Sequence, residues 1–148
     1  MRFVKRLFVG LAFVIGFFGV IQLVPFGRDH TNPPVVAEPA WDSPATRQLA
    51  VRACFDCHSN QTQWPWYSHV APFSWVVQRN VHTARTVLNF SDWTRSYELI
   101  AQAPGSVLAR EMPPRSYRMM HPLAQLTEAE KIQLARGLEA TFGLPQRN

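Results

Sequence analysis

The stretch Cys54-Phe55-Asp56-Cys57-His58 decides how the rest of the chain is interpreted. Its spacing, Cys-x-x-Cys-His, is the attachment signature of c-type haem. On a helix, the residues three and four positions after Cys54 share its face, so both thiols and the imidazole point the same way. The thiols can then bond to the two vinyl groups of one porphyrin edge, while His58 ligates the iron. The sequence therefore predicts one covalently attached haem c, bound by Cys54 and Cys57, with His58 as proximal ligand.

Other uses of two closely spaced cysteines explain the motif less well. A disulfide between Cys54 and Cys57 suits an oxidising compartment but gives His58 no role. A redox dithiol requires a βαβ context that the sequence lacks, and zinc requires further ligands at a regular spacing. These are the only two cysteines in the chain, so a multi-disulfide framework is excluded.

A methionine is the expected second axial ligand of the iron. Met112 precedes Pro113 and Pro114, which keep the backbone off a helical path and can hold a thioether on a loop. His121, which precedes a proline, is the strongest histidine rival. The other candidates are Met119, Met120, His30, His69 and His82. We expect Met112 to ligate, with another of these residues or an open position as the alternatives.

Residues 7–26 read LFVGLAFVIGFFGVIQLVPF, in which Gln22 is the only clearly polar side chain. Twenty helical residues span roughly 30 Å, the thickness of the hydrocarbon core of a bilayer. Arg2, Lys5 and Arg6 precede this run, and such a positive flank favours a cytoplasmic N-terminus. We expect a membrane anchor that is not cleaved and that places the remaining chain on the exported side.

A cleaved signal peptide is the main alternative for this segment. The apolar run is longer than a usual signal core, and Val35-Val36-Ala37 is only a weak cleavage site. A buried core helix fits poorly, because the run is almost wholly apolar and follows a cationic start. Residues 28–41, RDHTNPPVVAEPAW, contain three prolines and few core-forming side chains, which predicts an extended linker.

The pattern after Asp42 predicts helices and loops, with no convincing pair of strands. Three helix starts are marked by caps. Ser43-Pro44 opens a helix that runs toward Cys57, and Thr127–Glu130 forms a capping box. The remaining expected elements are a helix from Pro72, a helix capped by Ser91-Asp92, and a turn or short helix at Ser106–Arg110.

Apolar residues at helical spacing mark the faces expected to point inward. They are Phe73, Val77, Val81, Ala84 and Leu88 on the helix from Pro72, Trp93, Tyr97 and Ile100 on the next, and Ala129, Ile132, Ala135, Leu138 and Phe142 on the last. These faces are thin, so a large cofactor would complete the core. We expect an all-α protein divided into an anchor (1–27), a linker (28–41) and a haem-binding domain (42–148).

Composition and charge exclude several classes of function. The 148 residues are 47% hydrophobic and 17% charged, which excludes a disordered, low-complexity chain. Three of the 15 basic residues precede residue 7, and the other 12 are nearly balanced by 10 acidic residues. No basic run and no glycine-rich phosphate loop follow, so we expect neither nucleic acid nor nucleotide as a partner.

The sequence around the motif resembles a known bacterial group. The stretches that carry the resemblance are Ser59–Ser68, which includes Trp-Pro-Trp-Tyr-Ser, then Ala71–Trp75, Leu88–Trp93, Met112–Pro114, Tyr117 and His121-Pro122. They are similar to the haem-binding domain family of small, often membrane-anchored monohaem c-type proteins, over roughly residues 45–140. The resemblance implies a cytochrome-c-like helical domain of four or five short helices around one haem, with Met112 as natural distal ligand.

Further expectations concern the haem pocket and the role of the protein. Candidate pocket residues are Trp64, Pro65, Trp66, Tyr67, Pro72, Trp75 and Tyr117, although ordinary core packing is as good an explanation for the tryptophans and Tyr67. We expect a non-enzymatic electron carrier in the bacterial inner membrane, anchored in lipid through residues 7–26, with its domain in the periplasm and redox proteins as partners. The alternatives are a haem-based sensor, a small peroxidase, or an accessory subunit of a respiratory complex.

Overall fold

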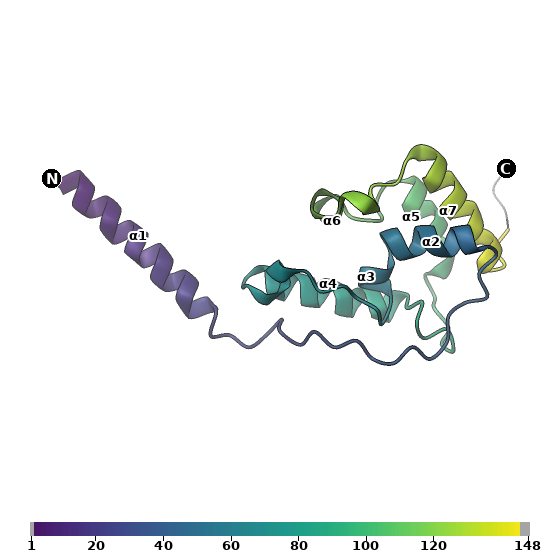
Figure 1. Ribbon diagram of the computed structural model, residues 1–148, viewed down its shortest axis with the longest axis horizontal. Helices are drawn as coiled ribbons and strands as arrows, with labels where there is room; N and C mark the ends of the chain where they lie inside the picture. Colours follow the sequence, from purple (N-terminus) through teal and green to yellow (C-terminus); the bar gives the residue numbers. More distant parts are fainter. Residues whose placement is uncertain (1, 146–148) are drawn as a thin grey trace. The chain divides into compact units, whose positions relative to one another are not determined.

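Figure 1 shows a computed structural model of the chain, which describes residues 2–145. Within these residues the fold is all-helical, as predicted, with an apolar helix at the N-terminal end and no strands. The α-helices are α1 (Arg2–Ile21), α2 (Pro44–Ala53), α3 (Phe55–His58), α4 (Phe73–Val87), α5 (Ala103–Leu108), α6 (Arg115–Met120) and α7 (Glu128–Thr141). Three short 3-10 helices are η1 (Trp66–His69), η2 (Ile100–Gln102) and η3 (Pro122–Ala124).

The chain forms two compact units. The first unit contains the chain up to His30 together with Trp64–Asn80, and the second contains Thr31–Gln63 together with the chain from Val81 onward. The polypeptide therefore passes from one unit to the other three times. The expected division into anchor, linker and haem-binding domain remains a prediction about function, which these structural units do not test.

Two of the predicted helix starts are confirmed by their caps. The Ser43 hydroxyl accepts a hydrogen bond from the Thr46 amide at 3.2 Å, and a proline occupies the first turn of α2. At α7, Thr127 and Glu130 form the complete capping box. The helix from Ser43, however, ends at Ala53, so the stretch predicted as one helix is divided into α2 and α3.

The helix predicted after Ser91-Asp92 does not form, because tertiary contacts occupy the groups that would cap it. The Ser91 hydroxyl accepts a hydrogen bond from the Asn60 amide, and the Ser91 carbonyl accepts one from the Val36 amide at 2.8 Å. Residues 91–98 are turns and extended backbone, although Tyr97 is buried as expected. The short helix expected at Ser106–Arg110 begins earlier, at Ala103.

The core of the second unit lies among α2, α5 and α7, which Figure 1 shows side by side. Its buried members are Leu49, Ala50, Ala53, Phe55, Leu88, Phe90, Tyr97, Val107, Leu126, Leu134 and Leu138. The inward faces were predicted only in part. Leu138 and Ala135 are buried as expected, whereas Ile132 and Phe73 are exposed. Leu134, which the pattern did not select, is fully buried at the centre of α7.

Residues 31–41 are extended, as predicted for a linker, but they pack along the second unit. The Asn32 side chain donates to the Thr62 carbonyl at 2.9 Å. Ala37 forms an isolated β-bridge with Asp92. The Glu38 carboxylate accepts two hydrogen bonds of 2.7 Å from Arg47. This segment is therefore part of a folded unit and does not act as a free tether.

Candidate functional site

The cysteines and histidine of the motif lie on one tight turn. The Cys54 carbonyl accepts hydrogen bonds from the amides of Cys57, at 3.1 Å, and His58, at 2.8 Å. Neither cysteine forms a disulfide, and both residues are half-buried. Burial raises the pKa of Cys54 to about 12 and that of Cys57 to about 11, with the Asp56 carboxylate adding to the second shift. Both groups are therefore thiols at neutral pH.

The imidazole of His58 is oriented by the backbone at the end of α4. Its Nδ1 atom lies 3.1 Å from the Ala84 carbonyl oxygen and 3.0 Å from that of Leu88. Because carbonyls only accept, Nδ1 must carry the proton, which leaves the Nε2 lone pair for a metal. Burial lowers the pKa of His58 against the opposing effect of these two hydrogen bonds, so the ring is neutral.

These groups fit a covalently bound haem. A metal-bound imidazole normally donates a hydrogen bond from its second ring nitrogen. His58 makes such hydrogen bonds through Nδ1, to the carbonyls of Ala84 and Leu88. Two thiols on the same turn supply the attachment chemistry that the motif predicts. Within residues 2–145, no group of three or more His, Cys, Asp or Glu side chains is placed to hold a metal ion by itself.

Asp56, the residue between the two cysteines, connects the motif to α6. Its carboxylate accepts a hydrogen bond of 2.6 Å from the Tyr117 hydroxyl. The ring of His121 stacks on that of Tyr117, with 4.1 Å between centroids, and His121 Nδ1 lies 4.0 Å from the same carboxylate oxygen. These contacts place Tyr117, a predicted pocket residue, beside the turn Cys54–His58, which we call the attachment turn after its predicted role. The role of Asp56 had no sequence signal, because its partner is 61 residues away.

Met112 lies on the loop between α5 and α6, immediately before the segment that Asp56 fixes. The Ser106 carbonyl accepts hydrogen bonds from the amides of both Glu111, at 3.0 Å, and Met112, at 3.1 Å. The Met112 side chain is 42% exposed, and the side chains of Met119 and Met120 are more exposed still. Its thioether is available to a ligand, and its assignment to the iron remains a prediction.

Arg85, on α4, fixes the chain that follows the motif. Its guanidinium donates to the carbonyls of Ser59, at 2.8 Å, and Thr31, at 3.0 Å. It also donates to the Asn32 side-chain oxygen and the Thr62 hydroxyl, both at 2.9 Å. Arg85 therefore has a structural role that the sequence did not indicate.

All the other predicted pocket residues belong to the first unit, whereas the attachment turn belongs to the second. They are Trp64, Pro65, Trp66, Tyr67, Pro72 and Trp75. Within the first unit, Trp64 stacks on His30 with 4.4 Å between ring centroids, and Trp66 meets Tyr67 edge-on. The indole nitrogens of Trp64 and Trp75 are buried without a hydrogen-bond partner among the described residues. The contribution of this set to a haem pocket remains a prediction.

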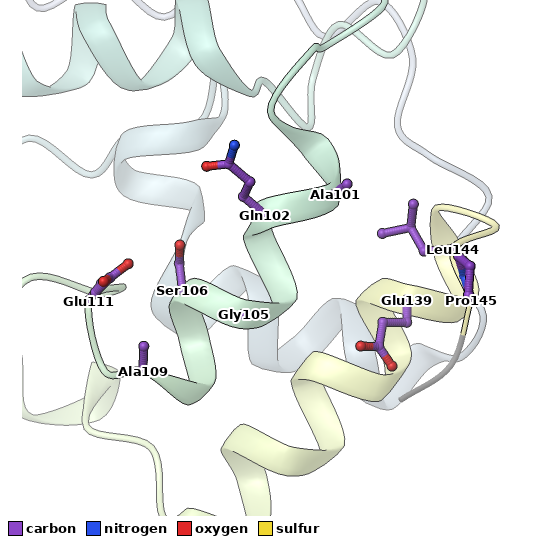
Figure 2. Close-up of a pocket in the computed structure, with 9 residues that line it drawn as sticks. All are labelled: Ala101, Gln102, Gly105, Ser106, Ala109, Glu111, Glu139, Leu144 and Pro145. Atoms are coloured by element: carbon purple, nitrogen blue, oxygen red, sulfur yellow. The ribbon is translucent and has the colours of Figure 1, made fainter. Parts of the chain in front are cut away.

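The second unit also contains a cavity of about 520 Å³. Figure 2 shows that residues of α5, the loop that follows and the end of α7 line it. Its lining includes Gln102, Ser106, Glu111 and the buried Glu139. None of the predicted haem-binding residues lines it.

The turn Cys54–His58, with its two thiols and its oriented, neutral imidazole, fits a helical haem-binding protein. The chain belongs to the haem-binding domain family, whose model matches residues 16–140. The match covers the attachment turn, α4 and the Met112 loop together. No curated protein and no solved structure is significantly similar to the chain.

Proposed function

We propose that this protein is a membrane-anchored monohaem c-type cytochrome that carries single electrons on the exported side of a bacterial inner membrane. The observation that carries the proposal is the turn Cys54–His58, with the His58 Nδ1 proton held by two backbone carbonyls. When bound, the haem iron alternates between the ferrous and ferric states and so takes up and releases one electron.

In this proposal the chain's residues would bind and orient the cofactor. The S–H bonds of Cys54 and Cys57 would each add across a vinyl group, and the two thioethers would prevent loss of the haem from so small a domain. His58 would supply Nε2 to the iron, while the carbonyls of Ala84 and Leu88 keep the ring from rotating. Met112 would supply its thioether to the iron from its loop.

Ligation of the iron by both His58 and Met112 would favour electron transfer over catalysis. Peroxidase chemistry requires an open coordination position with an acid–base group and a charge-stabilising donor beside it. Ligation by both His58 and Met112 would leave no position open to substrate. The protein is therefore proposed to be a carrier and not an enzyme, with redox proteins of the same membrane as its partners.

The structure supports the anchoring part of the proposal through residues near α1. A helix with the length and composition of α1 fits both a membrane span and a signal sequence. Cleavage near residue 37 would, however, remove residues that the folded chain uses. Gln22 hydrogen-bonds both backbone groups of Ala71, and the Val36 amide donates to the Ser91 carbonyl. These contacts favour an uncleaved anchor, and the basic residues before it favour an N-terminus in the cytoplasm.

The test combines mass, spectrum and location. The intact mass should exceed that of the chain by one haem, and acid–acetone should not extract it. The matched variants Cys54→Ala and Cys57→Ala should each retain at most one thioether. N-terminal peptide sequencing should find residues 7–26 in the mature protein. Complete extraction of the haem would contradict covalent attachment, and a mature N-terminus near Glu38 would contradict the anchor.

Electron exchange is measured separately. The purified protein should be reduced by a quinol-oxidising membrane fraction and reoxidised by an oxidase, and CO should bind its ferrous form slowly or not at all. Fast binding of CO or NO without electron exchange would replace this proposal with a gas sensor. Turnover of peroxide with an organic donor would instead indicate an enzyme.

A further inference from the structure

The end of α1 is attached to the aromatic segment Trp64–Asn80 within the first unit. The side-chain amide of Gln22 donates to the Ala71 carbonyl at 3.0 Å and accepts from the Ala71 amide at 2.9 Å. Ala71 is almost completely buried. One polar side chain therefore satisfies both backbone groups of a residue 49 positions later and fixes the depth of that residue relative to α1.

Two further contacts extend this attachment. Gly27 adopts a positive φ of 81°, and a Cβ there would lie 2.6 Å from the Ser74 carbonyl carbon and oxygen, so only glycine permits this approach. The ring of His30 stacks on Trp64, and its Nε2 lies 3.0 Å from the Ser68 carbonyl oxygen. Gln22, Gly27 and His30 thus each contact the segment 64–75.

Several large apolar side chains of the same unit are exposed to solvent. We call them the juxtamembrane patch, and they are Leu23, Val24, Phe26, Trp66, Phe73 and Val76. Leu23 is 80% exposed, Trp66 76% and Phe73 60%. The patch combines residues that directly follow α1 with residues from the aromatic segment.

We propose that the juxtamembrane patch binds the lipid bilayer, with Trp66 and Phe73 at the boundary between headgroups and acyl chains. This inference rests on the proposed membrane anchoring by α1. It assigns to the Trp-Pro-Trp-Tyr-Ser stretch a lipid contact in addition to any contribution to the haem pocket.

The apolar run that begins in α1 supports lipid as the partner of the patch. The run covers residues 7–26, whereas α1 ends at Ile21. About twenty residues are needed to cross the roughly 30 Å of a hydrocarbon core, so the apolar residues just beyond α1 belong to the stretch that meets the bilayer. Those residues are the apolar Leu23, Val24 and Phe26. Because Gln22 and Gly27 contact the aromatic segment, that segment lies near the same residues. Tryptophan is enriched at this depth in membrane proteins.

The experiment places Trp66 relative to lipid and water in the full-length holoprotein. The protein is labelled with 5-fluorotryptophan, reconstituted into phosphatidylcholine–phosphatidylglycerol nanodiscs and studied in the ferrous state by fluorine NMR. Trp66→Phe assigns the Trp66 resonance, and Trp93→Phe assigns a core tryptophan of the second unit as the internal control. A spin label near the top of a lipid acyl chain should broaden the Trp66 line severalfold more than the Trp93 line. A gadolinium chelate in the water should broaden Trp66 little.

Each other outcome contradicts the inference. A Trp66 line broadened by the aqueous chelate and unaffected by the lipid label would place the patch in water. A line that neither probe broadens would place Trp66 against protein. Alkaline carbonate extraction separates failure of the anchor from failure of the patch. Release of the protein by carbonate would overturn anchoring and the patch together, whereas a retained protein with Trp66 in water would overturn the patch alone.

Discussion

His58 receives its orientation from backbone carbonyls that lie 26 and 30 residues further along the chain. The motif defines the chemistry of the ligand, but the turn at the end of α4 selects the ring nitrogen that faces the metal. The sequence predicts a histidine beside two thiols, because that information is local. It does not identify Ala84 and Leu88 as the partners of Nδ1, because any carbonyl has the same chemistry and only the tertiary fold chooses between them.

Met112→Ala should remove the weak far-red absorption band that methionine–iron coordination gives in the oxidised protein. The reduction potential should also fall, by a sizeable part of the roughly 0.8 V range that axial ligands control. Met119→Ala and Met120→Ala are the matched controls, since both side chains are more exposed than that of Met112. Persistence of the band in Met112→Ala, with its loss in a control, would transfer the assignment to the neighbouring methionine.

Tyr117→Phe should destabilise the folded protein by about 2 kcal/mol, because it removes a hydrogen bond to a carboxylate. The bond joins the Tyr117 hydroxyl to Asp56 at 2.6 Å and so connects α6 to the attachment turn. Urea denaturation of the holoprotein measures the change. Thr86→Val, which removes an exposed hydroxyl bonded within α4, is the control and should change stability little. Equal stability of Tyr117→Phe and wild type would show that this contact does not hold α6.

At the scale of whole elements, cap residues predict helices only where no tertiary partner competes for them. Ser43 and Thr127 cap α2 and α7 as predicted, because their hydroxyls bond to their own helices. Ser91 has the same local signal, but its hydroxyl and carbonyl bond to Asn60 and Val36, and no helix follows. The sequence therefore predicts α2 and α7, but it does not predict the irregular backbone at residues 91–98.

The pH dependence of stability should change in Glu130→Gln. Hydrogen bonds from Thr127 and Arg52 lower the pKa of Glu130 from 4.5 to about 2. A carboxyl group with a lowered folded-state pKa contributes stability above about pH 4.5, and that contribution is lost as the pH falls toward 2. Urea midpoints of wild type and variant should therefore differ at pH 7 and converge near pH 2. Glu98→Gln, at an exposed position outside the helix caps, is the control. A constant difference across this range would refute the assignment.

Gly137→Ala should destabilise the crossing of α2 and α7 by about 2 kcal/mol, as expected for overpacking a filled site. A Cβ at Gly137 would lie 2.0 Å from the Thr46 hydroxyl oxygen and 2.6 Å from its methyl group. Thermal unfolding measures the loss. Arg136→Ala, at the adjacent exposed position of α7, is the control and should have little effect. Unchanged stability of Gly137→Ala would mean that the two helices can separate without cost.

At the scale of the whole molecule, the segment expected to be only an anchor also completes a folded unit. Composition identifies residues 7–26 as apolar, because hydropathy is a local property. It does not show that Gln22, Gly27 and His30 bind the segment 64–80, which begins shortly after the motif in sequence but belongs to the other unit. The chain passes between the units three times, whereas the linker composition indicates a single extended connection.

In a soluble form of the protein, the protection of the backbone around Ala71 should therefore depend on the residue at which the anchor is removed. A chain that begins at Phe18 retains Gln22 and the Phe18 carbonyl that its side chain also contacts, whereas a chain that begins at Thr31 loses both. In the shorter chain the Ala71 amide loses its partner Gln22 Oε1, and its carbonyl loses Nε2. Each lost bond is worth about 1 kcal/mol, so hydrogen exchange of peptides that contain Ala71 should be roughly tenfold faster or more in the shorter chain. Peptides from α7, in the other unit, should exchange equally in both chains. Equal protection of Ala71 in the two chains would show that α1 anchors the protein without contributing to its fold.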